Sequence, residues 1–208
     1  MKKTKTHDLV LYATYGALIF VARTLDHLVS GWLPINFAII TLTVALSCAL
    51  FTPSIKNCVI AGFVFGVTSL LTTLMFGGGS MIYGFLNPLI SVMPRVIVGL
   101  VAFLSFTLSY ELLGNTIKKK TAFMLSIAIA CVFSALTNTV TVLTMIWVFK
   151  TIEGIDALYV IFTLNAIPEL IVPAIIAPFL VYAVRKSLKI KDAYTQDTLE
   201  QDGKGTEA

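Results

Sequence analysis

The residues of this chain that could do chemistry are a few charged and amide side chains inside long apolar stretches. Arg95, Asn138, Asn165 and Glu169 stand out, because a strongly polar side chain is costly in hydrocarbon and is therefore a candidate for function. An arginine there could present its planar fork to a carboxylate or phosphate of a substrate, while the amides could hydrogen-bond the substrate's polar groups. Arg95 and Glu169 could instead form a structural ion pair with each other.

These side chains are expected at similar depths. Counting a rise of ~1.5 Å per residue from the outer ends of the expected spans, Arg95 and Asn165 lie roughly 10 Å deep, and Asn138 and Glu169 about 16 Å deep. Arg23 lies near the outer end of the first apolar stretch. Because all five positions fall in the outer half of the membrane, the sequence predicts a substrate cavity that opens to the outside.

Further candidates lie close to the outer surface. Tyr83 belongs to a glycine-rich loop that could act as a lid over the cavity, and Asn87 directly precedes the next apolar stretch. Trp147 is a candidate contact too, although aromatic side chains are common at this boundary for packing reasons alone. Arg23 and Asp26, three residues apart on a helix, could simply pair with each other.

One expected helix carries a row of small polar side chains. Ser134, Asn138 and Thr141 recur at i, i+4 and i+7, with Thr137 and Thr144 flanking the same side. Hydroxyl side chains in membranes commonly hydrogen-bond between helices, which is the structural interpretation of the threonines. For Asn138, contact with a ligand remains an equal alternative.

The elements that must position these side chains are membrane helices. The chain is 57% hydrophobic and only 12% charged, whereas a soluble domain averages roughly 25% charged residues. A helix needs about 17–25 apolar residues to cross the hydrocarbon core of a bilayer. The sequence therefore predicts an all-α, polytopic membrane protein, a bundle of six transmembrane helices near residues 9–29, 35–52, 57–76, 88–112, 121–149 and 158–186.

The basic residues indicate the orientation. With six spans, eleven of the 15 lysines and arginines fall on the side of the termini, so the positive-inside rule predicts cytoplasmic N- and C-termini in the cell membrane. We expect a cytoplasmic segment over 1–8, a membrane domain over 9–188 and a disordered cytoplasmic tail over 189–208. The eleven are Lys2, Lys3, Lys5, Lys56, Lys118, Lys119, Lys120, Arg185, Lys186, Lys189 and Lys191.

Small residues and prolines predict how the helices pack. The pairs Gly62/Gly66 and Ala13/Ala17 have the small-x-x-x-small spacing that permits close helix approach. For the alanine pair, both packing inside the bundle and docking of a partner subunit are open. The prolines at 168, 173 and 178 each remove a backbone donor, so we expect the last helix to be kinked or broken near 165–169.

Several enzyme and cofactor signatures are missing from the sequence. The chain has no nucleotide-binding G-x-x-x-x-G-K-[ST] loop, no G-x-S-x-G elbow and no H-E-x-x-H. Its three cysteines and two histidines have no metal-ligand spacing. We therefore expect a chain that is not an enzyme and does not hydrolyse ATP by itself. We also expect it to bind no metal, no other cofactor and no nucleic acid.

The stretch N-P-L-I-S-V-M-P-R-V-I-V-G at 87–99 resembles a segment common in the substrate-specific components of energy-coupling factor vitamin transporters. The G-x-x-x-G at 62–66, the A-x-x-x-A at 13–17, the size and the six expected spans fit the same group over residues 7–190. The resemblance implies a six-helix bundle that captures a vitamin from outside. It also implies docking, through Ala13 and Ala17, onto a transmembrane coupling protein that carries two ATP-binding subunits, which would use the ATP.

Within that group the segment looks most like members linked to pantothenate. This anion bears hydroxyl and amide groups, which would suit arginines and asparagines, although Glu169 opposes an anion unless an arginine neutralises it. Cobalamin, folate, riboflavin or pyridoxine-type substrates remain alternatives. So do a proton-coupled carrier with Glu169 as the relay, and a scaffold subunit whose polar groups only hold helices together.

Overall fold

A computed structural model of the chain describes residues 5–30, 38–76, 86–149 and 155–188, without the side chains of 5–8, 30 and 155–165. These residues form α-helices and no strand, which confirms the all-α prediction. Each helix lies within a few residues of an expected span. In chain order they are α1 (Lys5–Ser30), α2 (Ile39–Phe51), α3 (Ile55–Phe76), α5 (Pro88–Gly114), α6 (Lys119–Val148) and α7 (Ile155–Ser187).

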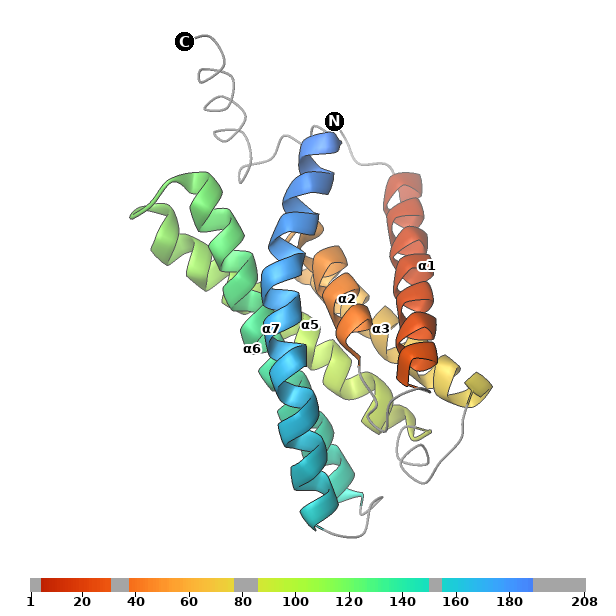
Figure 1. The fold of residues 1–208 in the computed structure, drawn as a ribbon. Helices are drawn as coiled ribbons and strands as arrows, with labels where there is room; N and C mark the ends of the chain where they lie inside the picture. The colour runs from red at the N-terminus through yellow and green to blue at the C-terminus, as the bar shows by residue number, and fades with distance from the viewer. Residues whose placement is uncertain (1–4, 31–37, 77–85, 150–154, 189–208) are drawn as a thin grey trace, which may run out of the picture.

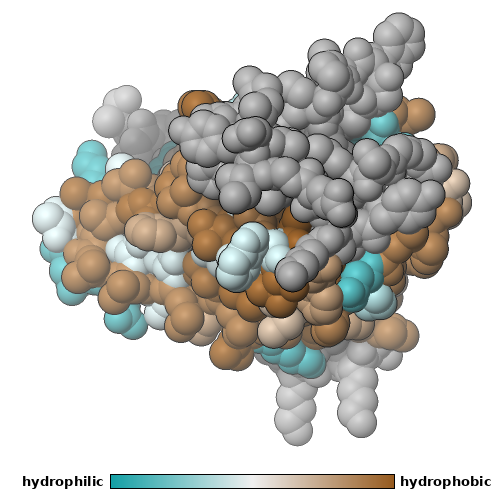
Figure 2. Space-filling view, turned by 90° about the horizontal axis from the view of Figure 1, so that it is seen from below, coloured by the Kyte–Doolittle hydropathy of each residue, from teal (hydrophilic) through white to brown (hydrophobic). Residues whose placement is uncertain are grey.

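Five of these helices are long and apolar enough to cross a membrane. The fold is therefore that of a multi-pass helical membrane protein. The described residues on the face seen in Figure 2 are largely hydrophobic. The prediction of six complete spans is not confirmed, because α2 has only 13 residues. Such a helix is about 20 Å long, whereas the hydrocarbon core is ~30 Å thick.

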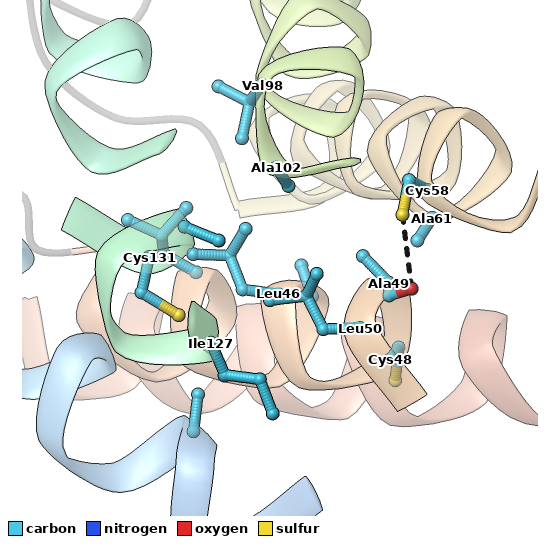
Figure 3. Packing of buried hydrophobic residues seen from close by; sticks show 14 of the residues in the cluster. Leu46, Cys48, Ala49, Leu50, Cys58, Ala61, Val98, Ala102, Ile127 and Cys131 are labelled. Atoms are coloured by element: carbon cyan, nitrogen blue, oxygen red, sulfur yellow. Dashed lines mark hydrogen bonds between the residues drawn. The ribbon is translucent and has the colours of Figure 1, made fainter. Parts of the chain in front are cut away.

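The short helix α2 lies at the centre of the bundle. The start of α1 and the end of α7 lie at the same end of the molecule, with α2 between them (Figure 1). α2 contacts α1, α3, α5, α6 and α7. Its residues Leu46 and Leu50 are buried among Ile127 of α6 and Ala61 of α3, with Ala102 of α5 close by (Figure 3). A helix covered on most sides can end inside the membrane if its terminal backbone groups find partners in the protein.

The carboxyl end of α2 finds such partners in side chains of other segments. Nη1 of Arg185, on α7, donates to the Phe51 carbonyl oxygen at 2.8 Å, and its guanidinium lies 4.8 Å from the centre of the Phe123 ring. Asn57 donates to the Thr52 carbonyl oxygen at 2.9 Å. Arg185 was expected to be a cytoplasmic surface charge, yet it is buried. A cation at the carboxyl end of a helix also complements the helix dipole.

Glycines let α3 and α5 cross with their backbones in contact. A Cβ added to Gly62 would overlap the Arg95 carbonyl oxygen, and one added to Gly99 would overlap the Cys58 carbonyl oxygen. A Cβ on Gly66 would lie 2.7 Å from the Cα of Val92. The G-x-x-x-G motif therefore packs inside the bundle, as its spacing predicts, and Gly99 completes the contact from the opposite helix.

The prolines of α7 do not break it. The helix is continuous from Ile155 to Ser187, with Pro168, Pro173 and Pro178 inside it, so the alternative of a broken helix is wrong. A membrane helix can tolerate proline where neighbouring groups satisfy the carbonyls that lose a donor. This continuity lets α7 run beside α2 over the whole length of the shorter helix.

Candidate functional site

The amino end of α2 is the place where four of the buried charged side chains among the described residues meet. Its N-cap residue is Ala38, whose side chain offers no hydrogen-bond acceptor to the first turn. Asp26 of α1 supplies one instead. Its Oδ1 accepts from the Ile40 backbone N–H at 3.1 Å, and its Oδ2 accepts from the Thr41 N–H at 2.7 Å and from the Thr41 hydroxyl. Asp26 thus caps a helix to which it does not belong.

A second carboxylate reaches the same helix end from the opposite side. Oε1 of Glu169, on α7, accepts from the Ala38 backbone N–H at 3.1 Å. Carboxylates are favoured at the positive end of a helix dipole, and the first N–H groups of a helix otherwise lack partners. Asp26 and Glu169 therefore join α1 and α7 through the start of α2.

Two arginines complete what we call the charge cluster, which consists of Arg23, Asp26, Arg95 and Glu169. All four side chains are at most 7% exposed. Arg23 interacts electrostatically with Asp26 and Glu169, and Arg95 with Arg23 and Glu169. Within the described residues, Nε of Arg23 is buried without a hydrogen-bond acceptor. The structure thus brings Arg23, Arg95 and Glu169 together, as their expected depths suggested.

Arg95 also has a local structural role. Proline at 94 has no N–H, so the Ile90 carbonyl oxygen four residues earlier loses its helical donor. Nη1 of Arg95 donates to this oxygen at 2.9 Å, and its guanidinium carbon lies 5.6 Å from the centre of the Phe65 ring. The Arg95 side chain therefore supplies the hydrogen-bond donor that Pro94 cannot provide. Neither sequence interpretation of Arg95 included this contact.

The polar row on α6 divides into two kinds of side chain. Asn138 and Ser134 face the interior, and Oδ1 of Asn138 and Oγ of Ser134 are buried without a partner in the described part of the chain. The hydroxyl of Thr137 donates to the Phe133 carbonyl oxygen, and Thr144 likewise bonds within α6. The expectation that these threonines bond between helices is wrong, because the carbonyl oxygen one turn earlier is the nearer acceptor.

The remaining candidates lie elsewhere or outside the described side chains. Oδ1 of Asn87 accepts from the Leu89 N–H at 3.0 Å, so this side chain caps α5, with Pro88 in the first turn. Trp147 is 69% exposed on the surface of α6. Tyr83 lies outside the described residues, and Asn165 lies in α7 where side chains are not described.

The alanine pair of α1 faces away from the bundle. Ala13 and Ala17 are exposed, and a Cβ added to Gly16 between them would meet no atom within 4 Å. Small residues on this face therefore pack against nothing among the described residues. This placement differs from that of Gly62 and Gly66, which are buried against α5.

Sequence reasoning missed two parts of this arrangement. Asp26 was considered only as a partner of Arg23, and Arg185 only as a topology signal. The lack of a capping residue before α2 was the available sign that an acid from another segment would be needed. Among the described residues, no group of three or more histidine, cysteine, aspartate or glutamate side chains is placed to hold a metal ion.

Comparison with known proteins adds no assignment to this geometry: no protein-family model matches the chain, and no curated protein matches it.

Proposed function

We propose that this chain is the substrate-binding membrane subunit of an ATP-driven vitamin importer of the energy-coupling factor type. The observation that carries the proposal is the charge cluster buried around the start of α2. A pair of arginines desolvated in a membrane protein is costly unless it serves an ion pair or a ligand. Residues 87–99, which include Arg95, resemble a segment of that family, and this resemblance supports the same proposal.

The bonding of the two carboxylates favours an anionic substrate. Glu169 and Asp26 are each held by backbone N–H groups of α2, so their negative charge is partly met by the helix end. A substrate carboxylate or phosphate would join the guanidinium groups of Arg23 and Arg95 in this cluster. Asn138 offers an acceptor to a substrate hydroxyl or amide. Pantothenate, which has these groups, is our first choice of substrate. Other vitamins of the same transporter family are the alternatives.

Binding by the isolated chain tests this function. The purified protein is incubated with radiolabelled pantothenate, folate, riboflavin, cobalamin and pyridoxine, each at nanomolar concentration, and is also reconstituted alone in liposomes. We expect tight binding of one vitamin and no uptake without partner subunits. Failure to bind any of the panel would contradict the proposal, and steady accumulation without ATP would favour a secondary carrier that uses Glu169.

The exposed face of α1 leads to a separate prediction about the partner. Ala17→Trp should abolish ATP-dependent uptake with the coupling protein and two ATP-binding subunits, while vitamin binding stays within a few-fold of the parent. The reason is that the indole separates helices that must approach closely. Ala183→Trp on α7 is the matched control, since Ala183 is also exposed. Uptake by Ala17→Trp at the parent rate would exclude this face as the docking surface.

A further inference from the structure

An apolar groove separates α1 from α7 in the half of the bundle where α1 begins and α7 ends. Its volume is about 460 Å³. One wall is α1 from Val10 to Leu18, the other is α7 from Leu180 to Leu188, and the floor is α2 from Val44 to Phe51. Cys48 lies on the side of α2 that faces α1 (Figure 3). We call this the α1–α7 groove.

The groove offers almost no hydrogen bonding to a guest. The Thr14 hydroxyl donates to the Val10 carbonyl oxygen at 2.9 Å, and the Ser47 hydroxyl donates to the Thr43 carbonyl oxygen at 2.7 Å. The Phe51 carbonyl oxygen already accepts from Arg185, and the hydroxyl oxygen of Tyr15 is buried below the surface. A polar or charged guest would lose its hydration without replacement, so the guest must be apolar.

The dimensions favour a chain-like guest. Each wall covers nine residues, or about 12 Å of helix, so the volume corresponds to a mean cross-section of roughly 40 Å². A helix with its side chains is about 10–12 Å wide, so only part of its width would enter the groove. The polar sequence of residues 189–208 makes that segment an unsuitable guest as well. A single hydrocarbon chain fits both the width and the chemistry.

Charge at this end of the bundle indicates which lipid would provide the chain. The groove lies where α1 begins and α7 ends, and the same end carries the start of α3, the end of α5 and the start of α6 (Figure 1). The lysines at these helix ends are Lys56 in the first turn of α3, Lys118, Lys119 and Lys120 at the start of α6, and Lys186 in the last turn of α7. Basic residues at one membrane surface attract anionic lipid head groups, at about 1 kcal/mol for each residue near the surface.

We propose that the α1–α7 groove binds one acyl chain of an anionic phospholipid in the leaflet on the side where α1 begins and α7 ends. The head group remains at the surface among the basic residues, and the acyl chain covers α2 where α1 and α7 diverge. This lipid completes the enclosure of α2, whose remaining sides are covered by protein. The site is distinct from the charge cluster, which lies at the other end of α2.

The test uses the full chain in vesicles of equal parts phosphatidylglycerol and phosphatidylcholine, followed by native mass spectrometry after detergent extraction. We expect one retained phosphatidylglycerol in the parent. Leu180→Trp narrows the groove from an exposed wall, and Ser47→Phe fills its floor. Each methylene that is excluded weakens binding about fourfold, so either change should lower retention roughly tenfold or more. Leu104→Trp, at an exposed position of α5 outside the groove, is the matched control and should retain the lipid as the parent does.

Three results would overturn the proposal. The first is a parent chain that retains no phospholipid, or retains phosphatidylcholine as well as phosphatidylglycerol. The second is equal lipid retention by Leu180→Trp, Ser47→Phe and Leu104→Trp. The third is a two-chain complex that disappears in the groove variants, because a second copy of the chain would then be the occupant. Since Leu180 is exposed, its substitution leaves the folded bundle available for the measurement.

Discussion

Gly99→Ala and Gly62→Ala proteins are expected to unfold at clearly lower temperature than the parent, with a loss of about 2–3 kcal/mol of stability for each change. The added methyl group would overlap a backbone carbonyl oxygen of the opposite helix, that of Cys58 for Gly99 and that of Arg95 for Gly62. A backbone atom cannot move aside by a change of rotamer. The two helices must therefore separate, and the contacts along their crossing are weakened.

Gly16→Ala is the matched control for these two changes. It makes the same chemical substitution inside a membrane helix, but a methyl group on Gly16 meets nothing within 4 Å. Because alanine favours the helix more than glycine does, this protein should be as stable as the parent or slightly more stable. Thermal unfolding in detergent, followed by a thiol-reactive dye or by size-exclusion chromatography, compares the three. Equal melting of Gly99→Ala and Gly16→Ala would show that the crossing of α3 and α5 is looser than described.

The helices themselves could be predicted from the sequence, because apolar length alone specifies a membrane helix. The exception is α2, for which a stretch of similar hydropathy gives a helix of only 13 residues. Its length depends on partners that are remote in sequence, Asp26 and Glu169 at one end and Arg185 at the other. Hydropathy contains no information about such contacts. The role of Arg185 was hidden for the same reason, since a basic residue after an apolar stretch is expected at the surface.

The sequence indicated which residues lie at the candidate site better than it indicated which hydrogen bonds they form. Rise per residue placed Arg95 and Glu169 at similar depths, and the structure brings both to the start of α2. That Glu169 bonds to the Ala38 N–H could not be deduced, because it requires the position of another helix. The bond between Arg95 and Ile90 could have been predicted, because a proline leaves the carbonyl oxygen four residues earlier without a backbone donor. The sequence contained that signal.

Arg95→Ala is expected to weaken vitamin binding by about 2–5 kcal/mol, the cost of removing one partner from a buried charge pair. Arg95→Lys should restore only part of this loss, because an ammonium group cannot reproduce the two parallel hydrogen bonds of a guanidinium. Equilibrium binding of the radiolabelled vitamin to purified protein gives both values. The single change to alanine, however, also strands the Ile90 carbonyl oxygen and removes a positive charge from beside Glu169.

Two double variants separate the ligand role of Arg95 from these structural roles. In Pro94→Ala with Arg95→Ala, the new backbone N–H at 94 can donate to the Ile90 carbonyl oxygen, so the helix no longer needs the guanidinium. In Arg95→Ala with Glu169→Gln, the carboxylate charge is removed together with the arginine. If Arg95 contacts the substrate, both proteins should fold and still bind the vitamin at least tenfold more weakly than the parent. If either binds as tightly as the parent, the role of Arg95 is structural: it bonds to the backbone of α5 or neutralises Glu169. The substrate anion would then be held by Arg23 or by neither arginine of the cluster.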